Sequence, residues 1–236
     1  MKKMLQKLLA SVAFAGALMA SANLSLAQIA NPPPALQAYG PPSALYPYTG
    51  GLTGSYTMTG VTGTMAAGLA ANSPIWAFRY TGTGVAVVKS IRFSAADTAT
   101  AFAAGLAQFN FFVARAFTAS DTGGTAATLT GNNGKLRTSF ATTGVGQFMT
   151  ATTGTMTAGT STLDAQPIAA ISLGVQAAAG VQLSDGSPSL IVFPQNAGDY
   201  PLVLAANEGI ELQATVPATG TWSGSITIVW DEYASY

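Results

Sequence analysis

The side chains of this sequence that could do acid–base chemistry are its carboxylates, because the chain contains no cysteine and no histidine. Imidazole and thiolate supply the base or the nucleophile in most hydrolase triads and are the usual ligands of zinc, so those mechanisms and sites are excluded. No carboxylate spacing matches a calcium-binding loop, and no glycine pattern matches a phosphate-binding loop. A cation held by loop oxygens stays an open alternative, and we assign no metal ion and no cofactor. The carboxylates are Asp97, Asp121, Asp164, Asp185, Asp199, Glu208, Glu211, Asp231 and Glu232.

One tripeptide has the form of a catalytic signature. Asp121-Thr122-Gly123 matches the motif of aspartic proteases, in which two such carboxylates share a proton and activate water. The motif occurs once, inside the polar stretch 120–134, and no apolar strand leads into it, so only a symmetric dimer could complete the pair. We interpret it as a chance match and Asn132-Asn133-Gly134 as a tight turn. Nothing in the sequence selects a glycosidase pair among the carboxylates.

The elements that would position these carboxylates are predicted to be β-strands. Gly209–Val216 and Thr221–Glu232 alternate apolar and polar residues, which is the two-residue period of a half-buried strand. Pro217 and Gly220 favour a turn between them, so we expect the two strands to pair as a hairpin. Asp231 and Glu232 are expected at a solvated strand end with their side chains on opposite faces. The expected buried positions are Ile210, Leu212, Ala214, Val216, Trp222, Gly224, Ile226, Ile228 and Trp230.

The rest of the chain after residue 54 is also predicted to be mainly β, with a helical period only over Ala95–Ala104. Short apolar runs are separated by Gly, Thr, Asn and Pro, and this number of strands suits two packed sheets. The further strand candidates are Ser55–Val61, Ile75–Thr81, Val85–Phe93, Leu106–Thr118, Leu136–Phe140, Gln147–Thr152, Ile168–Gly174, Leu190–Val192 and Pro201–Ala205. The fold class is therefore all-β, an antiparallel, jelly-roll-like β-sandwich over residues 55–236.

Two of these strands carry most of the aromatic residues. Leu106–Thr118 is the longest, is placed centrally, and puts Arg115 on a face with phenylalanines, so Arg115 needs a partner. In the other strand, Trp76, Phe78 and Tyr80 alternate and could form an exposed carbohydrate-stacking stripe, but packing in a core or an interface is the favoured interpretation.

The N-terminus has the pattern of a bacterial secretory signal peptide. Lys2, Lys3 and Lys7 precede the apolar stretch 8–22, and Ser25-Leu26-Ala27 places small residues at a cleavage site. The alternative is an uncleaved hydrophobic helix over residues 1–27, which would be the only part of the chain to touch a membrane.

Residues 28–54 are expected to form an extended arm. Pro32-Pro33-Pro34, Pro41-Pro42 and Pro47 exclude helices and sheet ladders. A plain spacer and a partner-binding segment are both open. Our candidate assembly contacts are Tyr39, Tyr46 and Tyr48 in this arm, together with Trp76, Phe78 and Tyr80.

The composition favours self-association. Charged residues make up 8% of the 236 residues, against about 25% in an ordinary soluble domain, and the formal net charge is zero. So few charges give little electrostatic protection against association, and a homo-oligomer is expected. The nine basic residues are too scattered for a nucleic-acid binder.

Several stretches resemble virion structural proteins of tailed bacteriophages. They are Lys135–Ser139, Ala151–Ile168, Pro201–Ile210, Val216–Trp222 and Val229–Glu232, and the similarity extends over roughly residues 75–236. The resemblance implies a β-sandwich at the surface of a capsid or tail, no catalytic residues, and partners among copies of itself and neighbouring virion proteins. The alternative is an exported subunit of a bacterial surface or extracellular filament with a cleaved signal peptide. An exported carbohydrate-active or carbohydrate-binding protein is a third, weaker hypothesis.

Overall fold

Two antiparallel sheets make up the β-sandwich seen in the computed structural model, which describes residues 51–69, 71–175, 190–193 and 200–235. Within these residues there are thirteen strands and no helix. The predicted signal segment 1–27, most of the predicted arm, and Tyr39, Tyr46, Tyr48, Asp185 and Asp199 lie outside the described residues. The strands are β1 (Leu52–Val61), β2 (Met65–Ala66), β3 (Ser73–Tyr80), β4 (Val85–Asp97), β5 (Gly105–Ala119), β6 (Gly124–Ala126), β7 (Val145–Ala151), β8 (Thr160–Leu163), β9 (Ala169–Val175), β10 (Leu190–Phe193), β11 (Leu202–Leu204), β12 (Glu208–Thr215) and β13 (Thr221–Tyr233).

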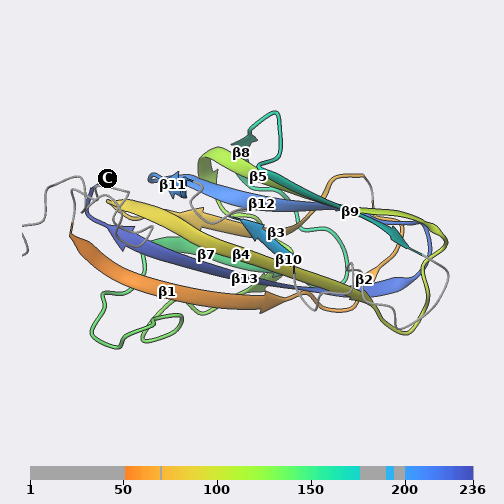
Figure 1. The fold of residues 1–236 in the computed structure, drawn as a ribbon, viewed down its shortest axis with the longest axis horizontal. Helices are drawn as coiled ribbons and strands as arrows, with labels where there is room; N and C mark the ends of the chain where they lie inside the picture. Colours follow the sequence, from red (N-terminus) through yellow and green to blue (C-terminus); the bar gives the residue numbers. More distant parts are fainter. Residues whose placement is uncertain (1–50, 70, 176–189, 194–199, 236) are drawn as a thin grey trace, which may run out of the picture. The chain divides into compact units, whose positions relative to one another are not determined.

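The first sheet, sheet A, has the order β1-β13-β4-β10, and β2 and β11 add short pairings to β13 and β4. Figure 1 shows β1, β13 and β4 running side by side. The second, sheet B, has the order β6-β7-β3-β12-β5-β8, and β9 pairs with β5 beside β8. The predicted all-β, two-sheet architecture is confirmed.

The predicted pairing of the last two long strands is wrong. β12 lies in sheet B between β3 and β5, whereas β13 lies in sheet A between β1 and β4. The segment Val216–Gly220 therefore crosses from one sheet to the other. Gly220 has φ of +114°, and a Cβ there would lie 2.9 Å from the Phe102 backbone, so this crossing needs glycine.

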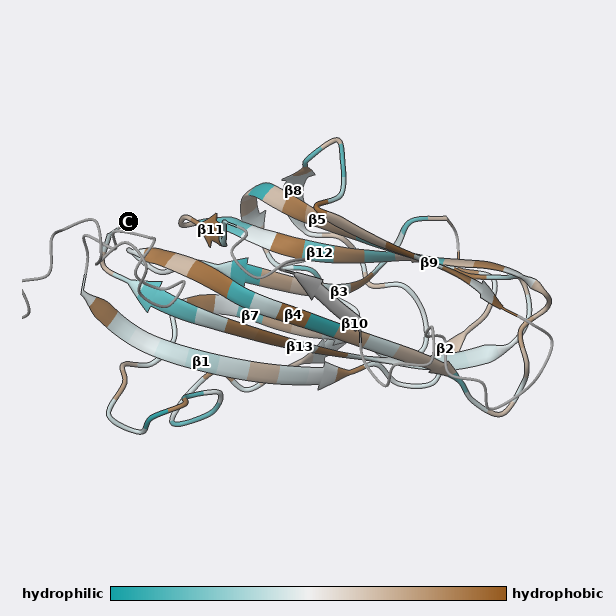
Figure 2. Ribbon diagram, in the orientation of Figure 1, coloured by the Kyte–Doolittle hydropathy of each residue, from teal (hydrophilic) through white to brown (hydrophobic). Residues whose placement is uncertain are grey.

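The alternation predicted for β13 is confirmed. Trp222, Gly224, Ile226, Ile228 and Trp230 are buried, and the residues between them from Thr221 to Val229 are partly exposed. In Figure 2 this strand is brown in its middle, whereas β1 is pale over most of its length. β13 is thus a central strand of sheet A with one face in the core.

Aromatic rings join the two sheets in the core. Phe78 of β3 meets Trp230 of β13 edge to face, with ring centroids 5.2 Å apart, and Trp230 stacks on Tyr56 of β1 at 5.3 Å. On the neighbouring strands of the two sheets, the ring centroid of Phe93 of β4 lies 4.7 Å from that of Phe109 of β5. Such aromatic contacts stabilise the fold beyond the free energy that the buried area contributes.

Three strands were missed and two expected elements are wrong. β2, β6 and β8 have at most four residues, so their sequences are too short to give a periodic signal. The expected strand Leu136–Phe140 is absent because this segment turns, with the Phe140 N–H donating to the Arg137 carbonyl. The helical period over Ala95–Ala104 is overridden, since Ala95–Asp97 continues β4 and pairs with β13.

Candidate functional site

The aromatic residues predicted as assembly contacts on β3 lie in the core. Trp76, Phe78 and Tyr80 are at most 2% exposed. Trp76 and Phe78 contact Phe148 and Trp230 respectively. The alternative of an exposed carbohydrate-stacking stripe is therefore wrong, whereas the favoured interpretation, packing in a core, is confirmed. These three side chains present no surface to another molecule in the folded chain.

The carboxylate of the aspartic-protease-like tripeptide is enclosed. Asp121 is 1% exposed, and its Oδ1 accepts a hydrogen bond of 2.6 Å from the Gly159 N–H. The Gln147 side chain of β7 bonds both the N–H and the carbonyl of Asp121, at 3.0 and 2.8 Å. Asp121 thus ties two loops to the outer face of sheet B. Its Oδ2 has no hydrogen-bond partner among the described residues.

Glu211 on β12 shares this outer face with Asp121 and is buried, although it lies on the polar face of a strand that was predicted to be half-buried. It is 2% exposed, and its Oε1 accepts a 2.7 Å hydrogen bond from Gln213. Burial raises the pKa of the Glu211 carboxyl, and the negative charge of Asp121 raises it further. Burial likewise raises the pKa of Asp121, while the Gly159 N–H and the Arg79 charge oppose that shift.

Glu232 forms a second enclosed carboxylate site, near the end of β13. Its Oε1 accepts from the Thr143 hydroxyl at 2.5 Å and from the Trp230 indole N–H at 3.0 Å, and the Gly144 N–H lies 2.9 Å from Oε2. The solvated strand end expected for Asp231 and Glu232 is therefore wrong, because the loop before β7 packs over it. Asp231 and Glu232 were expected to point to opposite faces, and their different partners agree with this, because Asp231 contacts Ser55 and Lys89.

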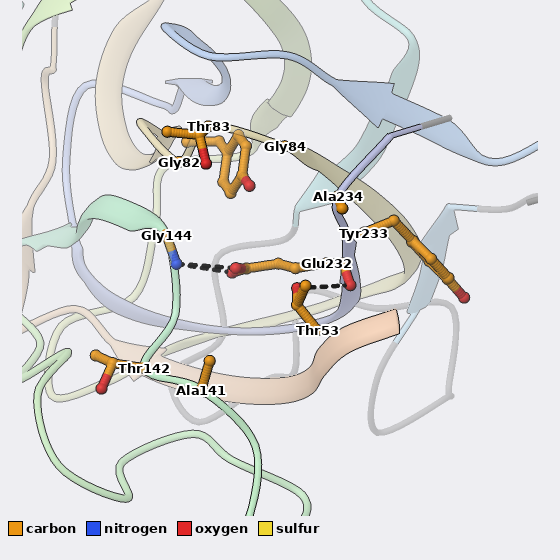
Figure 3. A pocket seen from close by; sticks show the side chains of 11 residues that line it. Thr53, Gly82, Thr83, Gly84, Ala141, Thr142, Gly144, Glu232, Tyr233 and Ala234 are labelled. Carbon is orange, nitrogen blue, oxygen red and sulfur yellow. Dashed lines mark hydrogen bonds between the residues drawn. The ribbon is translucent and has the colours of Figure 1, made fainter. Parts of the chain in front are cut away.

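A pocket of about 280 Å³ opens beside Glu232. Figure 3 shows Glu232 reaching toward the Gly144 N–H, with Thr53 and the glycines Gly82 and Gly84 around it. A Cβ on Gly84 would lie 2.0 Å from the Tyr233 carbonyl oxygen, so the close approach of these strand ends requires glycine. The pocket holds one carboxylate, and that carboxylate is already bound by three protein donors.

Two tyrosines border this end of the sandwich. Burial, followed by the Glu232 charge, raises the pKa of both Tyr56 and Tyr80 to about 12. The Tyr56 hydroxyl donates to the Ala141 carbonyl at 3.0 Å. Both phenols are therefore protonated at neutral pH.

Arg115 has the partners that its sequence position requires, and both are acidic. It contacts Glu208 at 2.6 Å and Asp164 at 3.3 Å. Ala116 next to it has φ of +46°, and this irregularity turns Arg115 out of the face that holds Phe111 and Phe117. The strand period alone places Arg115 in the core, which is why the sequence could not locate this ion pair on the surface.

The described carboxylates serve mainly as acceptors that hold the sandwich together. Three are in ion pairs, three accept hydrogen bonds on or beside the sheets, and Asp97 is buried at the end of β4. Over the described ranges, no group of three or more carboxylates could hold a metal ion. The roles of Glu211 and Glu232 were missed because alternation placed the first, and chain position the second, in solvent.

Comparison with known proteins gives no family. No family model matches the chain, and no curated protein matches it. In the part of the chain that the structure describes, no helix is long and apolar enough to cross a membrane.

Proposed function

We propose that this chain is a non-enzymatic structural protein of a virion surface, as a capsid decoration or a tail-associated component. It acts by multivalent contacts with copies of itself and with neighbouring virion proteins. The proposal includes a jelly-roll-like connectivity of the sandwich, a hydrophobic N-terminal helix over residues 1–27 and a Pro/Tyr arm that anchors each copy. No nucleic acid and no cofactor takes part.

One observation carries the proposal: most of the described carboxylates make hydrogen bonds or ion pairs within the fold. Glu232 is bound by three donors, Asp121 is enclosed by two loops, and Asp164 and Glu208 both pair with Arg115. A hydrolase that lacks cysteine and histidine would need a carboxylate with an open face and a substrate beside it. A rigid sandwich with a weakly charged, Thr- and Ser-rich surface suits assembly instead.

The second candidate is an exported bacterial surface or extracellular filament subunit, and the signal-like residues 1–27 favour it. In this alternative the segment is cleaved after Ala27, and the protein lies outside the cell.

The test is mass spectrometry of the N-terminal peptide from purified phage-like particles and, separately, from cell-free filaments or medium. Recovery from particles supports the virion role, with or without residues 1–27. A chain that begins at Gln28 and is found only outside particles overturns that role and supports the exported filament. A chain in neither fraction overturns both.

A further inference from the structure

Strand β9 leaves one of its two edges unpaired within the described residues. Ala169–Val175 pairs with β5 from Phe111 back to Gly105, and no described strand pairs with its other side. Figure 1 shows β9 beside β5 at the margin of sheet B. An edge of this kind presents a row of N–H and C=O groups that can pair with another strand.

The opposite margin of the sandwich, at β1, is protected against such pairing. The segment after Gly134 lies along β1, with the Thr57 N–H donating to the Gly134 carbonyl at 2.7 Å and the Leu136 N–H to the Ser55 carbonyl at 3.0 Å. This segment also carries Lys135 and Arg137, and charged side chains at an edge disfavour strand addition.

The remaining edge strands are short. β6 and β11 have three residues each, and β8 has four and is followed by Asp164 in the Arg115 ion pair. β10 also has four. β9 has seven residues and contains neither a charged residue nor a proline. Among the described strands, it is the long edge without these protective features.

The sequence of β9 is complementary to itself when two copies run antiparallel. Its burial is symmetric about Ser172, with buried residues at both ends, exposed residues at 170, 172 and 174, and half-buried residues at 171 and 173. A two-fold axis through Ser172 places Ile171 opposite Leu173 of the second copy, and Ala170 opposite Gly174. Apolar side chains then meet on the core face and small ones on the outer face, with no charge to repel.

We propose that a second copy of this chain binds at β9, so that the two β9 strands pair antiparallel about Ser172 and join two B sheets into one. This deepens the proposed function and rests on it, because it names the surface through which copies of a structural subunit associate. The half-buried Ile171 and Leu173, which already pack against the core, become covered by the same residues of the partner copy.

Cysteine cross-linking tests the pairing, since the full chain has no cysteine of its own. Opposed residues in antiparallel strands have Cα atoms about 4.5–5.5 Å apart, which a disulfide can span. The Ser172→Cys chain is expected to form a covalent dimer under mild oxidation. Ser139→Cys, in an exposed loop, is the matched control. Cross-linking of Ser172→Cys that is no faster than the control overturns the proposal.

A mixed experiment tests the register. Ala170→Cys and Gly174→Cys should each stay monomeric on non-reducing gels, because like residues would be about 14 Å apart, but a mixture of the two should cross-link. A Cβ on Gly174 meets no atom within 4 Å, so this variant keeps the fold. Equal cross-linking of each variant alone overturns the register.

Sedimentation of the uncross-linked full chain gives an independent readout. Ser172→Lys should weaken dimerisation at least about tenfold, the factor that 1.4 kcal/mol represents, whereas Ser139→Lys should not. Two results would overturn β9 as the contact between copies without touching the proposed structural function. The first is self-association that Ser172→Lys does not affect, and the second is a disulfide from the Ser172→Cys chain to a different protein. A chain that is monomeric at every concentration and absent from particles and filaments overturns the proposed function as well.

Discussion

Replacing Glu232 tests whether this carboxylate holds the loop before β7 onto the end of β13. In Glu232→Ala, the Thr143 hydroxyl, the Gly144 N–H and the Trp230 indole N–H lose their common acceptor. A buried donor left without a partner costs about 1–3 kcal/mol. Three donors give an upper range of about 3–9 kcal/mol, but Gly144 lines a pocket that water can enter. We therefore expect a loss near the lower end, about 3 kcal/mol.

The assay is urea unfolding at pH 7, followed by tryptophan fluorescence, with Glu208→Ala as the control. Glu208, unlike Glu232, pairs with the exposed cation Arg115, and such a surface pair contributes about 0–1 kcal/mol. A loss of about 3 kcal/mol corresponds to a melting temperature lower by about 6–12 °C for a domain of this size. If Glu232→Ala costs less than about 1 kcal/mol, or no more than Glu208→Ala, the anchoring role of Glu232 is refuted.

Three further predictions concern the tyrosines, the buried acid on β12 and the core. The pKa of Tyr56 and Tyr80 is raised to about 12, so the unfolded chain loses these protons first and stability should fall as pH rises from about 10 to 12; a flat unfolding free energy over this range would contradict the shift. Because burial raises the pKa of Glu211, its carboxyl binds a proton more tightly in the folded chain than in the unfolded chain. Glu211→Gln should therefore stabilise the protein at pH 7, and this gain in stability should shrink as pH falls toward the ordinary glutamate pKa. An unchanged or lower stability at pH 7 would show that the charged carboxylate is well solvated. Phe78→Ala should cost about 3–5 kcal/mol in denaturant unfolding because it leaves a cavity between the sheets, and Thr59→Ala, on an exposed position of β1, should change stability by about 0.5 kcal/mol or less; similar losses in both would place Phe78 outside the core.

The local period of each long strand could be predicted because it depends on the strand's own residues. Alternation in β13 correctly assigns Trp222, Ile228 and Trp230 to the core. The predicted Gly209–Val216 strand is also present, and its apolar face is buried as predicted, although Glu211 on the other face is buried as well. In both strands the apolar residues outweigh any competing local signal, so one face must be buried.

The partners of these strands could not be predicted. A short turn such as Pro217–Gly220 suits a hairpin, but the same length of chain also crosses between two packed sheets about 10 Å apart. Only the competition among all strands for neighbours places β12 beside β3 and β5, and β13 beside β1 and β4. The resemblance to virion proteins stays a prediction, as does the processing of residues 1–27.

For the candidate sites, too, some features follow from the sequence and others only from the tertiary structure. The sequence by itself determined that the chain lacks imidazole and thiol chemistry, that its body is β, and that Arg115 requires a partner, because these follow from residue types and their spacing. Only the tertiary structure decided that Glu211 and Glu232 are buried, and that β9 keeps an edge unpaired by any described strand, because these depend on which distant segments pack over or beside a strand. Burial changes the pKa of a carboxyl, and the neighbouring segments decide whether the backbone groups of an edge strand have hydrogen-bond partners. The residue pattern of a single strand predicts neither effect.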